Sequence, residues 1–336
     1  MNGLPESFRA FVAERAPDGE GASRGVREFR TADLPPGEVS VRVEWSGVNY
    51  KDALATIADG KVARISPLIP GIDLAGTVVA TRDDRFPVGS AVIAHGYDLG
   101  VARHGGYTEY ERVPADWVVP LPDGLTARDA MAIGTAGFTA AMSVAALQQR
   151  GLTPDDGPVL VTGASGGVGR MAVAMLARNG VEVWAVTGKP DEADRLKAAG
   201  ATGVLDRSTY AAGQGRALDR ERWAAAIDAV GAVSLPYVLR TLKHGGAVAA
   251  TGNTSGGALD LTIFPFILRG VSLIGIDSAN LDILRRRELW MRLAHDLRPL
   301  GLEDAITEVT LDTLEPALDA IHAGEARGRW VVRIAG

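Results

Sequence analysis

The pattern of apolar and polar positions changes once along the chain, near residue 125. From residue 7 to about residue 123, short runs of alternating apolar and polar residues, such as 39–45 and 76–80, are separated by Gly and Pro. Such alternation is typical of half-buried β-strands joined by turns. Residues 126–149 are rich in Ala and have helical spacing, and strand-like and helical runs then alternate. The pattern predicts a β-rich unit followed by an α/β unit with a parallel sheet.

Six apolar runs of the second unit predict six strands. The first begins at Val159, and the others cover 181–187, 203–206, 224–229, 247–251 and 271–276. Residues 285–297 have the spacing of an amphipathic helix. The last run, 330–334, has no sheet near it in sequence, so we expect it to return to the β-rich unit. The predicted domains are therefore 1–124 with 299–336, and 125–298.

A glycine-rich turn follows the first of these strands. Residues 159–169 read VLVTGASGGVG, and a helical run and the second strand close a βαβ unit within about thirty residues. Glycines let the backbone approach a pyrophosphate, and the helix N-terminus favours its negative charge. A tight connection without a ligand is the alternative, but the βαβ context favours a dinucleotide. The residues expected to contact it are Gly163, Ser165, Gly166, Gly167 and Val168, and Gly169 also suits such a turn.

The end of the second strand distinguishes between the two nicotinamide cofactors. NAD-binding proteins usually carry an Asp or Glu there, whereas this chain has Thr187, Gly188 and Lys189. A hydroxyl and a cation suit a 2′-phosphate, which an acid would repel, so we expect NADPH. Arg207 is a second phosphate ligand if the third strand lies beside the second, and a solvated surface arginine otherwise.

Composition excludes several other classes of protein. The formal net charge is −6 over 336 residues, which argues against general affinity for nucleic acid or anionic membranes. No run approaches about eighteen uninterrupted apolar residues, and the N-terminus lacks the pattern of a secretory signal. We therefore expect a cytoplasmic protein.

The chain contains no cysteine and only five histidines, at positions 95, 104, 244, 295 and 322. This excludes disulfides, thiolate metal sites and a cysteine nucleophile. Because no two histidines have the spacing of a ligand pair, we expect them to be surface or hydrogen-bonded residues and predict no metal.

The order of a β-rich unit, a Rossmann unit and a returning tail resembles the medium-chain dehydrogenase/reductase superfamily. The resemblance implies a GroES-like β-rich domain beside a doubly wound, six-stranded parallel Rossmann sheet. Zinc-dependent members carry a Gly-His-Glu segment where this chain has Gly71-Ile72-Asp73, so it is similar to the zinc-free, quinone oxidoreductase-like members. Five segments resemble the acrylyl-CoA reductase family: 49–52 (NYKD), 70–73 (PGID), 134–140 (GTAGFTA), 265–269 (PFILR) and 328–329 (GR).

This resemblance implies NADPH-dependent reduction of the C=C bond of a short enoyl-CoA thioester, acrylyl-CoA to propionyl-CoA, without a metal. Hydride adds to the β-carbon, negative charge develops on the thioester oxygen, and a proton reaches the α-carbon. Such a reaction needs hydrogen-bond donors near the oxygen and an acid or ordered water near the carbon. The likeness also implies a homodimer through the edge of the Rossmann sheet.

Candidate catalytic residues are Asn49, Tyr50 and Arg329, which match the family's segments. Three roles stay open for Tyr50: donation to the enolate oxygen, protonation of the α-carbon, or packing against the cofactor. Arg329 is expected to hold the thioester carbonyl, the cofactor or a CoA phosphate, the alternative being a salt bridge at a strand edge.

The resemblance adds further cofactor contacts. Tyr50, Ala53 and Arg329 are expected to contact NADPH from the β-rich unit. Asn253, Phe266, Ile267 and Ser278 resemble positions that line its nicotinamide half, with domain packing as the alternative. The arginines at 285–287 are expected on a solvated helix face or against CoA phosphates.

Two other functions stay open. An NADPH:quinone oxidoreductase needs the same cofactor site with a more open pocket. A non-catalytic NADPH-binding sensor or structural protein uses the same scaffold, because fold does not fix function.

Overall fold

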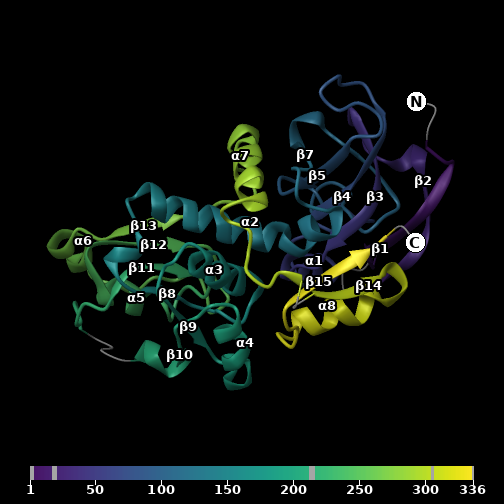
Figure 1. The fold of residues 1–336 in the computed structure, drawn as a ribbon. Helices are drawn as coiled ribbons and strands as arrows, with labels where there is room; N and C mark the ends of the chain where they lie inside the picture. The colour runs from purple at the N-terminus through teal and green to yellow at the C-terminus, as the bar shows by residue number, and fades with distance from the viewer. Residues whose placement is uncertain (1–3, 17–20, 212–215, 304–305, 335–336) are drawn as a thin grey trace. The chain divides into compact units, whose positions relative to one another are not determined.

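The computed structural model describes residues 4–16, 21–211, 216–303 and 306–334, which form two compact units (Figure 1). The first comprises the described residues within 1–135, 279–294 and 303–336, and the second those within 136–278 and 295–302. The predicted boundaries stay a prediction, but the helix α7 (Ile283–Ala294) belongs to the first unit, whereas we expected it in the second. It begins and ends slightly earlier than the predicted 285–297.

The second unit is built on a six-stranded sheet, shown in teal and green in Figure 1. The strand order is β10-β9-β8-β11-β12-β13 and every neighbouring pair is parallel, which confirms the prediction of a doubly wound Rossmann sheet. The strands are β8 (Val159–Val161), β9 (Val183–Thr187), β10 (Gly203–Asp206), β11 (Trp223–Asp228), β12 (Leu242–Ala250) and β13 (Ser272–Gly275).

Helices connect these strands and pack against the sheet, so its central strands are buried. The α-helices are α3 (Gly167–Arg178), α4 (Ala193–Ala198), α5 (Leu235–Thr241) and α6 (Phe264–Arg269), and the short 3₁₀ helices are η3 (Pro154–Asp156), η4 (Pro190–Glu192) and η5 (Arg207–Ala211). Asp191 and Glu192 of η4 directly precede α4, where helix N-termini favour negative charge.

The helix α2 (Ala127–Gln149) crosses from one unit to the other along the chain. The predicted continuous helix 126–149 is broken at Gly134, whose φ of 52° and ψ of −164° are not helical. The helix is long and apolar enough to cross a membrane, but most of its apolar window is buried inside the protein, as in a core helix. Cytoplasmic location stays a prediction.

The first unit contains a seven-stranded sheet and a separate antiparallel pair. The pair is β1 (Ser7–Arg15) with β2 (Ala22–Arg30). The sheet has the order β14-β15-β3-β4-β5-β7, and β6 also pairs with β3. Its strands are β3 (Val39–Gly47), β4 (Asp73–Thr81), β5 (Ala91–His95), β6 (Tyr110–Val113), β7 (Val118–Pro120), β14 (Ile306–Thr310) and β15 (Arg329–Arg333).

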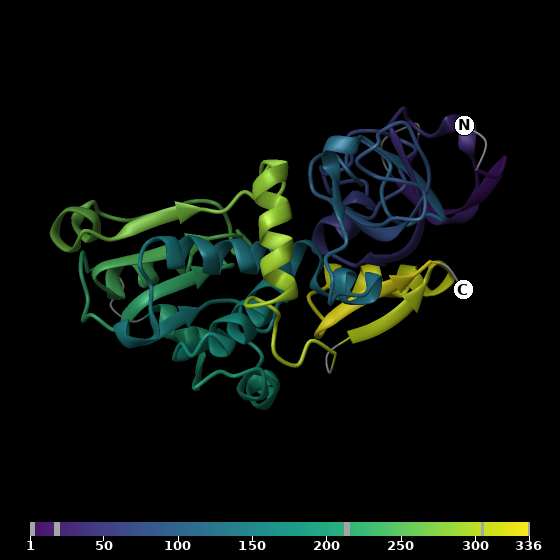
Figure 2. The same cartoon turned by 45° about the horizontal axis from the view of Figure 1, so that its top comes forward.

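The end of the chain returns to the β-rich unit, as predicted. β15 pairs antiparallel with β3, with Val331 opposite Gly47, and parallel with β14. Helix α8 (Leu314–His322) packs against β14 and α1 (Tyr50–Ala55). Figure 2 shows this yellow segment as one compact group. Among the described residues of this unit are the 3₁₀ helices η1 (Thr31–Asp33), η2 (Ala115–Trp117) and η7 (Leu311–Thr313).

One acidic residue of this sheet makes stability depend on pH. Glu111 of β6 is completely buried, and burial raises the pKa of its carboxyl to about 8 despite the nearby cations of Arg103 and Arg112. Between the ordinary pKa of a glutamate and pH 8, the folded protein therefore binds more protons at Glu111 than the unfolded chain does. The stability that this group contributes is present at low pH and is lost as the pH rises towards 8.

We predict that Glu111→Gln removes this dependence. Urea unfolding between pH 5 and 9 should show wild type losing stability relative to the variant, by at most about 1.4 kcal/mol for each pH unit. The exposed Glu28→Gln is the control and should run parallel to wild type. Parallel curves for Glu111→Gln and wild type would contradict the assignment.

Candidate functional site

The glycine turn after β8 has the geometry that a dinucleotide-binding turn requires. Gly163 has a φ of +58°, which glycine adopts without strain. A Cβ on Gly169 would lie 2.4 Å from the carbonyl oxygen of Gly163, so only glycine lets α3 pack this closely on the turn. Val168 is partly buried in the first turn of α3.

The N-terminus of α3 is suited to an anion. The N-cap residue is the exposed Gly166, and it places no capping side chain over the first N–H groups. The first helical residue, Gly167, also has no side chain. Because the leading N–H groups of a helix and its dipole attract negative charge, a pyrophosphate fits this end.

Hydroxyl groups join the glycine turn to the end of β9. The Thr187 hydroxyl donates to Ser165 Oγ at 2.9 Å, and the backbone N–H of Lys189 donates to Thr187 Oγ1 at 3.0 Å. Two predicted cofactor residues from separate segments, Ser165 and Thr187, are thus in direct contact.

Arg207 reaches the same place from the third strand. β10 pairs with β9, with Asp206 opposite Thr187, which meets the condition set for Arg207 as a phosphate ligand. A Cβ on Gly188 would lie 2.8 Å from Arg207 Cδ and 3.3 Å from Nη1, so the guanidinium lies against the glycine backbone. A hydroxyl, a lysine and an arginine surround Gly188, and this set of donors suits a 2′-phosphate.

Asp228, at the end of β11, organises this edge of the sheet. It is not among the site residues predicted from the sequence. Its buried carboxylate accepts hydrogen bonds from the Thr162 hydroxyl at 2.7 Å, from the Gly231 N–H at 2.9 Å and from the Ser234 hydroxyl. Thr162 directly precedes Gly163, so Asp228 holds the glycine turn against the loop after β11. Its position at a strand's carboxyl end was the available signal.

The remaining predicted residues of this unit have different surroundings. Asn253 is exposed on the loop after β12, and Ser278 accepts a hydrogen bond from the Thr139 hydroxyl at 2.7 Å. Phe266 packs on the core of the Rossmann unit, the packing alternative considered for it. Ile267 is exposed in α6. Their contacts with a cofactor stay predictions.

In the β-rich unit, the predicted residue Asn49 belongs to a buried polar network. Asn49 precedes α1, and its backbone N–H donates to Asp52 Oδ2 at 2.8 Å, while its side-chain amide donates to Asp73 Oδ2 at 2.7 Å. Asp52 Oδ1 accepts from the N–H of Ile72 at 2.8 Å. Burial, reinforced by the negative charge of Asp73, raises the pKa of Asp52 to about 7.

Asp73 connects this network to the break in α2. The backbone N–H of Thr135 donates to its carboxylate at 3.1 Å, and the Thr135 hydroxyl donates to Oδ1. Gly47 and Gly134 leave room for the network. A Cβ on Gly134 would lie 2.8 Å from Asp73 Oδ2 and 2.7 Å from Arg329 Nη2.

Arg329 is buried, with 4% of its surface exposed, and its guanidinium donates hydrogen bonds to residues of its own unit. Nε donates to the carbonyl of Ala132 at 2.9 Å, and Nη1 donates to the carbonyl of Val48 at 3.2 Å and to Asn49 Oδ1 at 3.3 Å. Burial lowers the pKa of Arg329, and the carboxylates of Asp73 and Asp52 oppose that shift. The structure thus brings Asn49 and Arg329 together.

Tyr50 and Ala53 lie about one turn apart in α1 and differ in exposure. Tyr50 is half exposed, and its ring stacks on His322 with the centroids 6.2 Å apart. Ala53 is buried in the core cluster. Of the predicted catalytic residues, Tyr50 is the one whose side chain is accessible.

Of the arginines at 285–287, which we expected on a solvated helix face, Arg285 is exposed but Arg286 and Arg287 make contacts inside the first unit. Arg286 is completely buried, and its Nη1 lies 3.0 Å from His95 Nδ1, while the Trp290 indole donates to His95 Nε2 at 2.8 Å. Burial, with the charge of Arg286, lowers the pKa of His95 well below its usual value. Arg287 donates to the carbonyl of Val118 at 3.2 Å. These two arginines hold α7 in the first unit; a role in CoA binding stays open for Arg285.

Within the described ranges, no group of three or more Asp, Glu, His or Cys side chains is arranged to hold an ion. The predicted absence of a metal stays a prediction.

Comparisons with known families match both units. Residues 35–123 match the alcohol dehydrogenase GroES-like domain, and residues 167–294 match the zinc-binding dehydrogenase domain. The predicted fold class, a GroES-like domain with a Rossmann domain, is confirmed.

Similar proteins cover nearly the whole chain. Acrylyl-CoA reductase AcuI of Ruegeria pomeroyi is 47% identical over 97% of this chain and 99% of its own length. Putative quinone oxidoreductase YhfP of Bacillus subtilis is 47% identical over the same shares, and its crystal structure with NAD bound has a TM-score of 0.95 over 98% of this chain and 100% of that chain. The yhdH oxidoreductase of Salmonella enterica in complex with NADP is 45% identical, with a TM-score of 0.94 over 97% of this chain and 100% of that chain.

The Rossmann and GroES-like domains define a class of nicotinamide-dependent oxidoreductases. Within it, this chain belongs to the acrylyl-CoA reductase family of the medium-chain dehydrogenase/reductase superfamily.

We predict that Gly134→Ala destabilises the protein more than a glycine substitution that meets no neighbour. The added methyl would press on Asp73 and Arg329. Gly89→Ala is the control, because Gly89 also has a positive φ, +91°, but nothing lies within 4 Å of its Cβ position. The free energy of unfolding should fall by about 2 kcal/mol more for Gly134→Ala than for Gly89→Ala. Equal losses would show that the network relaxes freely.

Proposed function

We propose that the protein is an NADPH-dependent reductase of the C=C bond of short enoyl-CoA thioesters, with acrylyl-CoA as substrate and propionyl-CoA as product. The choice of NADPH as cofactor is supported by the guanidinium of Arg207, which lies against Gly188, beside Thr187. The substrate rests on the relatives named acrylyl-CoA reductase at 46% and 47% identity.

The residues present fit the cofactor. The uncapped N-terminus of α3 would hold the pyrophosphate, and Ser165, Thr187, Lys189 and Arg207 would hold the 2′-phosphate. When bound, NADPH supplies the hydride that adds to the β-carbon. The similar protein crystallised with NAD makes the preference between the two cofactors the point to test.

The remaining chemistry falls to donors of the β-rich unit. As negative charge develops on the thioester oxygen, a positioned O–H stabilises it more than water does. We propose that Tyr50 supplies this O–H, because its ring is half exposed and α1 fixes its backbone.

Asn49 and Arg329 are proposed as positioning residues. Their side chains are buried and bond to each other, to Asp73 and to backbone carbonyls, so they hold the segment that carries Tyr50. The α-carbon is then protonated by Tyr50 or by water, and the reduction balances with one hydride and one proton.

We predict that Arg207→Ala raises the KM for NADPH about 10- to 100-fold and leaves the KM for NADH almost unchanged, because only NADPH has the 2′-phosphate. Steady-state kinetics with each cofactor measure this effect. Arg178→Ala, at the exposed end of α3, is the control and should behave as wild type. If wild type oxidises NADH as efficiently as it oxidises NADPH, the assignment of the 2′-phosphate site is wrong.

We predict that Tyr50→Phe lowers kcat with acrylyl-CoA about 100-fold and leaves the KM for NADPH unchanged, because the ring stays and the donor is lost. Tyr110→Phe is the control. Unchanged kcat in Tyr50→Phe would reduce Tyr50 to a packing role.

The substrate is tested by NADPH oxidation with acrylyl-CoA, crotonyl-CoA and a quinone. Fast turnover of the thioesters supports the proposal. The second candidate function is that of an NADPH:quinone oxidoreductase, which the relative named putative quinone oxidoreductase favours. Turnover of the quinone without turnover of the thioesters would establish it. Binding of NADPH without turnover of any of the three substrates would indicate a non-catalytic NADPH-binding sensor or structural protein.

We also propose a homodimer through the edge of the Rossmann sheet. β13 is an edge strand, and exposed apolar side chains of α6 and β13 lie there: Phe264, Ile267, Leu268 and Leu273. Light scattering should give twice the mass of one chain for wild type, and the mass of one chain for the double substitution Ile267→Asp, Leu273→Asp. A monomeric wild type would contradict this proposal.

A further inference from the structure

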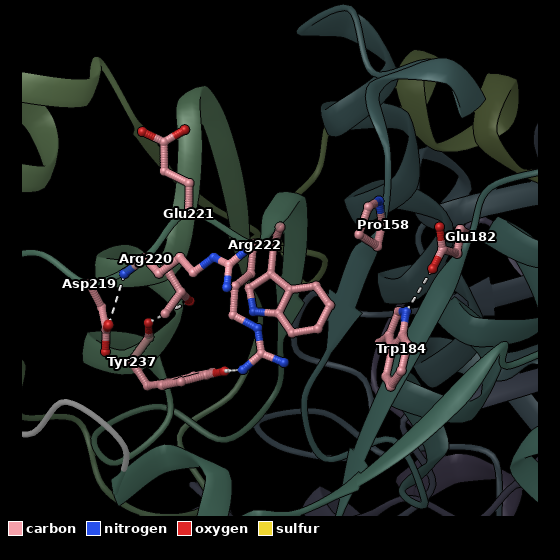
Figure 3. A pocket seen from close by; sticks show the side chains of 10 residues that line it. Pro158, Glu182, Trp184, Asp219, Arg220, Glu221, Arg222 and Tyr237 are labelled. Carbon is pink, nitrogen blue, oxygen red and sulfur yellow. Dashed lines mark hydrogen bonds between the residues drawn. The ribbon is translucent and has the colours of Figure 1, made fainter.

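One feature that the proposed function does not use is a pocket of about 560 Å³ in the Rossmann unit (Figure 3). Pro158, Glu182, Arg222 and Thr241 line it, and each directly precedes a strand of the parallel sheet. The pocket therefore lies at the amino ends of β8, β9, β11 and β12, whereas the glycine turn and Arg207 lie at the carboxyl ends. Its volume is in the range of small-molecule sites.

Aromatic side chains form its walls. Trp184 and Trp223 have ring centroids 6.1 Å apart with an angle of 52° between the planes, and Tyr237 also lines the pocket. Trp184 lies over Gly203 of the neighbouring strand, where a Cβ would be 2.5 Å from the indole ring. Trp223 and Tyr237 are almost completely buried, whereas Trp184 is partly exposed, so Trp184 is the ring that offers flat apolar surface to a planar ligand.

One wall residue has an unsatisfied polar atom. Trp223 is 98% buried, and its indole N–H has no hydrogen-bond acceptor among the residues that the structure describes. A buried donor without an acceptor is unfavourable, and native proteins rarely keep one. An acceptor atom on a ligand in the pocket would satisfy it.

The acidic side chains that line the pocket are held by other residues. The acids have partners: Glu182 accepts from the Trp184 indole at 2.8 Å, and Glu221 pairs with Arg269 at 3.3 Å. Asp219 accepts from the backbone N–H of Arg220 at 2.8 Å.

The two arginines of the lining are not compensated in this way. Across the described ranges, neither Arg220 nor Arg222 pairs with a carboxylate. Figure 3 shows Arg222 directed at the Tyr237 hydroxyl, to which it donates at 3.3 Å, and its guanidinium lies 4.9 Å from the centroid of the Trp223 ring. Its remaining N–H groups are available to a carboxylate or phosphate.

We propose that this pocket is a second ligand site, which binds a planar conjugated molecule carrying an anionic group. The ring lies against Trp184, the anionic group meets the guanidinium of Arg222, and an acceptor atom receives the Trp223 indole N–H. The site is separate from the nucleotide edge of the sheet, so a ligand binds there while NADPH is bound.

Calorimetry with 2-naphthoate and the neutral 2-naphthamide, in saturating NADPH, tests the proposal. Wild type should bind the carboxylate at least about tenfold more tightly than the amide, and Arg222→Gln should lose that difference. Arg178→Gln is the charge control and should bind as wild type. A titration with NADPH alone reports separately on the proposed function.

Trp223→Phe tests the unsatisfied donor, because it keeps an aromatic ring and removes the N–H. It should weaken 2-naphthoate binding at least about fivefold. The smaller ring leaves a cavity at this buried position and lowers the melting temperature of the ligand-free protein, so binding is compared at a temperature where both proteins are folded. Absence of saturable 2-naphthoate binding, equal affinity for the amide, or wild-type affinity in both variants would overturn the proposal.

Discussion

The carboxylate of Asp73 is held out of water, and the arrangement of the β-rich unit depends on how it is satisfied. Its hydrogen-bond donors come from two distant segments, the Asn49 amide before α1 and Thr135 at the break in α2. Arg329 of the last strand adds its positive charge nearby and a bond to Asn49. Because a buried charge is costly unless donors surround it, these segments are constrained to meet at Asp73. The position of Tyr50, which directly follows Asn49, is set by the same network.

The two units were predictable from sequence to different extents. Periodicity and the glycine turn were enough for the six parallel strands, because burial on both faces and a phosphate-binding turn leave local signals. The return of the last strand also followed, since an apolar strand without a nearby partner must pair elsewhere. The proximity of Arg207 to Gly188 depended only on which strands are neighbours.

Buried polar contacts were not predictable in this way. Nothing local distinguishes Arg286, which contacts His95 inside the unit, from an arginine on a solvated face. The break at Gly134 interrupts a run with good helical spacing, and directly after it Thr135 turns its N–H towards Asp73. Such contacts join residues far apart in sequence, so their evidence is tertiary.

We infer that this scaffold delivers a hydride to an activated double bond. Acrylyl-CoA should be reduced with NADPH that carries deuterium at the transferred position, and the product examined by NMR. We expect propionyl-CoA with one deuterium on the β-carbon and, for unlabelled NADPH in D₂O, one deuterium on the α-carbon. Label that is absent from the thioester, while a quinone is reduced in the same assay, would contradict it.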